Sequence, residues 1–89
     1  MTITKEFFDK IASGDKKIEY RKDIPFYEKV FANPVKNITF HYRRRVYLDC
    51  EISHVEKIKR PDFLSKSKFI DTENCFAIHI SSCQVRNGK

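Results

Sequence analysis

Near the start of the chain, apolar residues recur at spacings of three and four. This period is typical of an amphipathic helix and predicts one over residues 5–13. Thr2 or Thr4 can cap its first turn, and Gly14, which tolerates a positive φ, can end it. The expected apolar stripe of this helix consists of Phe7, Phe8, Ile11 and Ala12.

Further along, apolar and polar residues alternate, as they do in half-buried strands. Over residues 17–21, Ile18 and Tyr20 alternate with charged residues, so this strand is expected to have one apolar and one charged face. Strands are also predicted over 35–43, 46–52 and 76–81. The residues expected to face inward on these three strands are Ile38, Phe40, Tyr42, Val46, Leu48, Cys50, Ile52, Phe76, Ile78 and Ile80.

The alternation breaks at Ser53-His54, which predicts a bulge or bend of the kind that closes small barrels. A short second helix can begin at Pro25, with Phe26, Val30 and Phe31 on one face, and Asn33-Pro34 ends it. Residues 61–74 are predicted to form a loop with one helical turn, and residues 84–89 extend the last strand or form a tail. The predicted fold class is α+β, a small β-barrel of about five strands with one N-terminal helix and a second short helix.

The composition fits a single domain spanning residues 1–89, because a chain of 89 residues can bury one modest core. There are 18 Lys and Arg against 12 Asp and Glu, which gives a net charge of +6. Such an excess favours polyanionic partners, most simply nucleic acid. No stretch approaches the length of a membrane span, so neither a membrane partner nor a membrane segment is predicted.

Three cysteines without a C-x-x-C pair argue against a disulfide framework and a zinc ribbon. A reducing, cytoplasmic location is therefore expected. The histidines, His41, His54 and His79, have no ligand spacing along the chain, so no metal site is predicted. No cofactor is predicted either, because the chain contains no P-loop, dinucleotide fingerprint or nucleophile elbow.

The segment after the first predicted helix carries a spaced set of residues, Gly14-x-Lys16-x-x-Glu19-x-Arg21. The helix before it contains the run FFDKI at residues 7–11. Together these residues resemble the signature of the ASCH domain, a family of small PUA-like β-barrels. The resemblance implies a PUA-like barrel over nearly the whole chain. It also implies that Lys16, Glu19 and Arg21 look into a cleft between helix and barrel.

The resemblance further implies two kinds of chemistry. Some bacterial members of the family are small amidohydrolases acting on acetylated cytidine, and others have been described as ribonucleases. In such an enzyme, the catalytic residues would be Lys16, as base or nucleophile, and Glu19, as its ionised orienting partner. The amidohydrolase branch carries a threonine where this chain has Glu19, with a separate acidic residue further along. This departure counts against amidase activity.

Binding without catalysis is the alternative for the same three residues. A carboxylate between two cations can form a paired network that fixes the cleft and meets a phosphate or a base edge. We favour this interpretation over catalysis. It makes Lys16, Glu19 and Arg21 the centre of a nucleic-acid-binding site.

The densest basic run is Arg43, Arg44 and Arg45, at the expected turn between two strands. Taken as three adjacent charges alone, this run is interpreted as a hairpin turn exposed to solvent. Beside a cleft it would instead hold phosphates, and its neighbours Tyr42 and Tyr47 could stack on unpaired bases.

The leading hypothesis is an ASCH-like, PUA-related module that binds RNA or a modified nucleoside in a basic cleft. The first alternative is an enzyme in the same cleft, a nucleoside amidohydrolase of the N4-acetylcytidine type or a ribonuclease. The second is a protein-interaction regulator of a phage or mobile element, whose basic face meets an acidic partner. The sequence leaves the ligand and the oligomeric state open.

Overall fold

The computed structural model describes residues 1–64 and 70–87. These residues form two α-helices, one short 3-10 helix and four strands, which confirms the predicted α+β class with two helices. In chain order the elements are α1 (Lys5–Ser13), β1 (Ile18–Lys22), α2 (Pro25–Val30), β2 (Asn37–Arg43), β3 (Val46–Lys59), η1 (Asp62–Leu64) and β4 (Asn74–Asn87).

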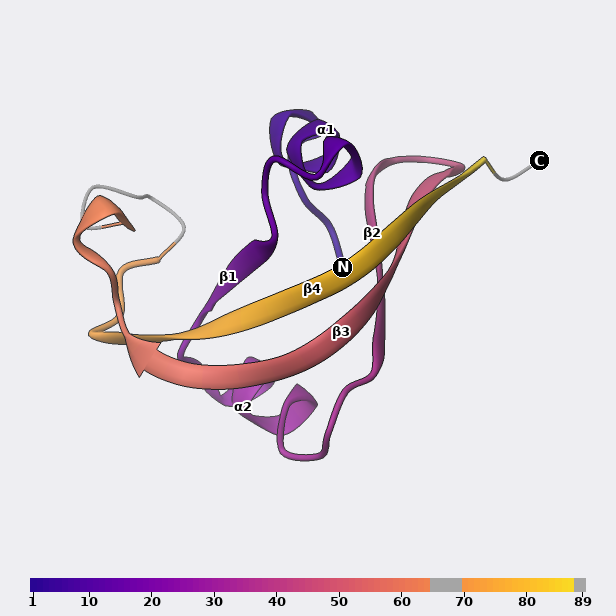
Figure 1. Cartoon of the computed structure of the whole chain (residues 1–89). Coiled ribbons are helices and arrows are strands. Elements are labelled where there is room, and N and C mark those ends of the chain that lie inside the picture. Colours follow the sequence, from indigo (N-terminus) through magenta and orange to yellow (C-terminus); the bar gives the residue numbers. More distant parts are fainter. Residues whose placement is uncertain (65–69, 88–89) are drawn as a thin grey trace.

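All four strands belong to one antiparallel sheet with the order β1-β4-β3-β2. The sheet is strongly curled, and β3 and β4 run through it as two long curved ribbons (Figure 1). The strands β1 and β2 lie at its two edges. For the described residues, the predicted barrel of about five strands is therefore corrected to a curled half-barrel of four.

The number of strands is smaller because β3 does not end at its bend. Its register with β4 shifts between Glu51 and Ile52 and again between Ile52 and His54, which confirms the bulge predicted at Ser53-His54. A bulge bends and twists a strand without ending it, so residues 53–59 continue β3. The strand β4 also extends to Asn87. The predicted loop contains η1, while its residues 65–69, like residues 88–89, lie outside the described residues.

The ends of α1 are fixed as the sequence predicts. The Thr4 side chain accepts a hydrogen bond from the backbone N–H of Phe7 at 3.2 Å. At the other end, Gly14 has φ 87° and donates its N–H to the carbonyl of Ile11. Phe8 and Ile11 are buried, whereas Ala12 is exposed, so the predicted apolar stripe is narrower than expected.

The core fills the concave side of the sheet beneath α1. Its most completely buried large side chains are Phe40, Ile11, Leu48 and Ile78, which come from α1 and three different strands. The helix α2 begins at Pro25, as predicted, but the three residues expected on one apolar face, Phe26, Val30 and Phe31, are not buried together. Only Phe31, just after α2, packs inward, with its ring 5.1 Å from that of Phe76, while Phe26 is 61% exposed. Among the described residues, no helix is both long and apolar enough to cross a membrane.

The first residues of the chain run beside the free edge of β2. The N–H of Ile3 donates to the carbonyl of His41 at 2.9 Å, and the N–H of His41 donates to the carbonyl of Met1 at 2.8 Å. Thr2 forms a parallel bridge with the same residue of β2. This segment, residues 1–3, therefore extends the curled surface from β2 back toward β1 (Figure 1). The gap between the segment and β1 is where the candidate site lies.

Candidate functional site

The strand β1 turns its charged face toward the core. Glu19 pairs in register with Ile78 and Arg21 pairs with Phe76, and directly paired residues share one face of a sheet. Ile78 is a core residue, so both charged side chains project to the concave side. The apolar face of β1 lies on the other side. There Tyr20 packs edge-on against Phe63 at 5.6 Å.

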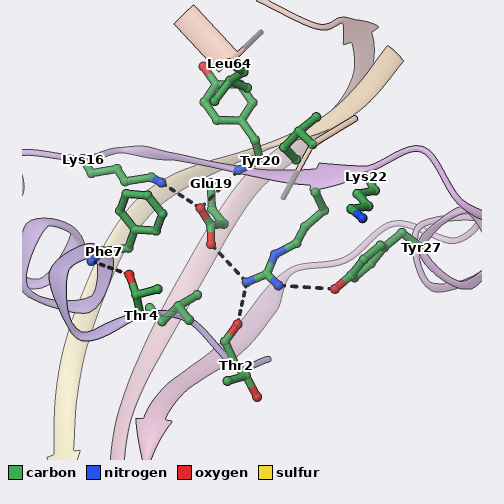
Figure 2. A pocket seen from close by; sticks show the side chains of 12 residues that line it. Thr2, Thr4, Phe7, Lys16, Glu19, Tyr20, Lys22, Tyr27 and Leu64 are labelled. Carbon is green, nitrogen blue, oxygen red and sulfur yellow. Dashed lines mark hydrogen bonds and ion pairs between the residues drawn. The ribbon is translucent and has the colours of Figure 1, made fainter. Parts of the chain in front are cut away.

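Glu19 is the one buried charged residue among those that the structure describes, with 5% of its surface exposed. Its Oε1 accepts hydrogen bonds from Lys16 Nζ at 2.8 Å and from the backbone N–H of Tyr20 at 3.2 Å. Its Oε2 accepts from Arg21 Nη2 at 3.0 Å. Figure 2 shows Glu19 with the Lys16 ammonium directed at it across the turn. We call Lys16, Glu19 and Arg21 the charged triad.

Arg21 connects three parts of the chain. Besides Glu19, its Nη2 donates to the carbonyl of Thr2 at 3.0 Å, and its Nη1 donates to the hydroxyl of Tyr27 at 3.3 Å. The guanidinium therefore ties β1 to the N-terminal segment and to α2. Its Nε is buried and has no hydrogen-bond partner among the described residues.

Lys16 is held by the turn that follows α1. Its backbone N–H donates to the carbonyl of Lys10 at 3.0 Å, which fixes the chain between Gly14 and β1. Its Nζ lies 3.8 Å from the centre of the Phe7 ring, a cation–π distance, while it also bonds Glu19. A flexible lysine is thus confined to one position, and its side chain is 18% exposed.

The charged triad lines a cleft of about 420 Å³ whose walls are mostly apolar. Lys22 adds a third cation at its border, and it lies 3.6 Å from Asp71. Figure 2 shows the cleft from close by, with the Tyr20 ring and Leu64 on the far side of β1 from Thr2. The lining residues are Thr2, Ile3, Thr4, Phe7, Lys16, Glu19, Tyr20, Arg21, Lys22, Tyr27, Leu64 and Ile70.

The arginine run lies elsewhere. Arg44 and Arg45 form the turn between β2 and β3, Arg43 ends β2, and all three are exposed. Tyr42 packs edge-on against Phe8 of α1 at 4.8 Å, which occupies one edge of its ring. None of these residues is among the described residues that line the cleft.

Tyr47 belongs to neither group. Its ring lies 4.5 Å from the guanidinium carbon of Arg86 on β4 and 6.4 Å from the ring of His41. Of the eight residues expected to bind nucleic acid, the structure thus brings only the charged triad together in a cleft.

Sequence reasoning missed several contributors to the cleft. Thr2 contributes through its backbone carbonyl, which every residue type has, so no pattern could identify it. Tyr27 is positioned by α2, and its contact with Arg21 depends on how that helix folds back.

Scans of the chain against protein-family models, curated proteins and solved structures find no match. The resemblance to ASCH domains and the PUA-like topology therefore stay predictions.

Proposed function

We propose that the cleft binds a nucleoside, either free and modified or as an unpaired base of RNA. The observation that carries this proposal is the buried carboxylate of Glu19, held between Lys16 and Arg21 inside an apolar cleft. Burying the Glu19 carboxylate and partly burying its two cations beside apolar walls costs desolvation free energy. Replacing such a set by apolar residues is often neutral or stabilising. A site with this cost is best explained by a ligand.

The size and walls of the cleft support a flat, partly polar ligand. Pockets that bind small ligands have volumes of about 300–1,000 Å³, and this cleft has about 420 Å³. Phe7 and Tyr27 on its walls offer aromatic faces on which a base can stack.

The unused hydrogen-bonding positions of the charged triad match the edge of a base. A carboxylate has about four acceptor positions, and the contacts of Glu19 with the triad and with Tyr20 occupy three. The fourth can accept an exocyclic N–H. The free N–H groups of Lys16, whose side chain is 18% exposed, can donate to a ring carbonyl or a phosphate.

The test compares two adjacent lysines. Lys16 lies in the cleft, whereas Lys17 is exposed and outside its lining. Calorimetric titration with cytidine, N4-acetylcytidine and short single-stranded RNA should give saturable binding to the wild type. Lys16→Met should weaken it by about ten- to a hundredfold, the effect of losing one charge-assisted hydrogen bond, and Lys17→Met should not. Equal affinities for the two variants would remove the cleft from consideration.

A hydrolase in the same cleft is the second candidate. It is favoured by the 2.8 Å contact between Lys16 Nζ and Glu19 Oε1, a distance at which a proton can pass between amine and carboxylate. Incubation with N4-acetylcytidine and with single-stranded RNA, followed by mass analysis, tests it. Release of cytidine or cleaved RNA that is lost in Lys16→Met would make the protein an enzyme. Intact substrates with measurable binding would leave it a binding module.

A further inference from the structure

Two histidines meet on the outer face of the sheet, away from the cleft. His54 on β3 and His79 on β4 are cross-strand partners, with ring centres 4.0 Å apart and planes inclined by 13°. Side chains alternate along a strand, and the neighbouring Ile78 points into the core, so His79 points outward. The prediction of no metal site rested on spacing along one chain, which cannot show that two strands bring these residues together.

Glu56 completes the group, and we call these three residues the His-Glu cluster. Its Oε2 lies 3.6 Å from His54 Nε2, and its Oε1 lies 3.5 Å from His79 Nε2. One ligand atom from each residue can be chosen so that all lie within 4.8 Å of one another. When a zinc ion is coordinated tetrahedrally with metal–ligand bonds of about 2.0–2.1 Å, neighbouring ligand atoms lie about 3.4 Å apart. Each of the two nitrogen–oxygen spacings is close to this value, although they join different oxygens of Glu56. Small rotations of the exposed His54 and Glu56 side chains would bring one oxygen and both nitrogens around a single ion.

Ser53 at the bulge favours one tautomer of His54. The Ser53 hydroxyl lies 3.3 Å from the carbonyl of His79, to which it can donate, and 3.1 Å from His54 Nδ1. Because the hydroxyl has a single proton, both hydrogen bonds form together only when Nδ1 donates to the Ser53 oxygen. In that tautomer, the lone pair of a neutral His54 ring is on Nε2, which faces Glu56. This is the arrangement that neighbouring groups impose on histidines that bind metals.

We propose that the His-Glu cluster binds a divalent transition-metal ion of the Zn²⁺ type. The Nε2 of His79 is buried without a hydrogen-bond partner among the described residues, so its capacity to bind is unused. When the Nε2 of His79 is also unprotonated, two lone pairs face one carboxylate, and a cation between them relieves the repulsion. Two imidazoles and one carboxylate form a set that zinc uses, with the fourth position left to water. Magnesium and calcium prefer oxygen ligands alone.

Such an ion would join β3 to β4 beside the bulge, where the register shifts. The test is calorimetric titration of the full chain with zinc chloride, and with magnesium chloride as the hard-cation control. We expect one zinc ion per chain and no binding of magnesium. His79→Gln and His54→Gln should each weaken zinc binding by more than about tenfold, whereas His41→Gln, which alters the third histidine on β2, should not.

Melting in the presence of a chelator checks that each variant is folded, and melting with zinc gives a second readout. Binding to the folded state alone raises the melting temperature, so zinc should stabilise the wild type and His41→Gln but not His79→Gln. Glu56→Gln, at a half-exposed position, tests the third ligand with little risk to the fold. Unchanged zinc affinity in the His54 and His79 variants would overturn the proposal. A cobalt complex with thiolate charge-transfer absorption would also overturn it, because the metal would then be on a cysteine.

Discussion

The charged triad makes one quantitative prediction about folding. In Glu19→Gln the side chain keeps its shape but loses its charge, so Lys16 and Arg21 face each other as cations beside a neutral amide. Removing one partner of a buried ion pair costs about 3–5 kcal/mol. The Lys16 and Arg21 side chains are 18% and 15% exposed, so water offsets part of this cost. We expect a loss of about 2–3 kcal/mol in the free energy of unfolding.

For a domain of this size, such a loss lowers the melting temperature by about 10–20 °C. The matched control is Asp15→Asn, the same chemical change at an exposed acid near the start of the same turn. It should change stability by no more than about 0.5 kcal/mol. Thermal and urea unfolding followed by circular dichroism and tyrosine fluorescence measure both variants. Equal melting temperatures for the two would show that Glu19 behaves as a surface charge and refute the reasoning.

A third variant separates stability from binding. Replacing the whole charged triad by Lys16→Met, Glu19→Leu and Arg21→Met removes all three charges together. Replacement of a complete buried set by apolar residues is often neutral or stabilising, so this variant should melt close to the wild type. It should also lose nucleoside binding. A triple variant as unstable as Glu19→Gln would mean that the triad serves mainly to hold the fold together.

Four further predictions concern other parts of the molecule. Changing Arg43, Arg44 and Arg45 to Ser should flatten the salt dependence of RNA binding by roughly 2 units on a log–log plot if all three contact phosphates; an unchanged slope makes the turn a solvated hairpin. Arg45 has φ 65°, so Arg45→Gly should raise stability by about 1 kcal/mol in urea unfolding. Burial raises the pKa of the Cys50 thiol to about 12, so at pH 8 iodoacetamide should alkylate Cys83 well before Cys50. Unfolded thiols ionise near pH 9 while Cys50 stays protonated, so stability should fall as pH rises from about 9 to 12, and this fall should be smaller in Cys50→Ala.

Local signals made most of the elements predictable. The capping of α1 by Thr4 and Gly14 depends on neighbouring backbone groups. The bulge at Ser53-His54 was visible as a break in the alternation of apolar and polar residues along one strand. Burial was less predictable, because it depends on what packs from elsewhere. Ala77 lies on the face opposite Phe76 and Ile78, yet it is 1% exposed.

The candidate site was predictable only in part. The spacing of Lys16, Glu19 and Arg21 marked the triad, but alternation predicted only that β1 has one apolar and one charged face. The structure shows that the charged face is the one turned toward the core. The anchoring of Arg21 by Thr2, and the meeting of His54 with His79, join residues far apart in the sequence. Such contacts depend on the curl and register of the sheet. The pattern of apolar and polar residues within one segment does not show which distant residues the sheet brings together.

The position of β1 in the sheet has a consequence for motion. Within the part of the chain that the structure describes, it is a strand of five residues with a paired neighbour on one side only, whereas β3 and β4 each have paired neighbours on both sides. Local opening costs least where backbone pairing and buried contacts are fewest. The strand β1, which carries Glu19 and Arg21 of the charged triad, can therefore separate from the sheet more readily than the core strands can. The contacts of Arg21 with the Thr2 carbonyl and the Tyr27 hydroxyl are then what holds this edge strand to the N-terminal segment and to α2.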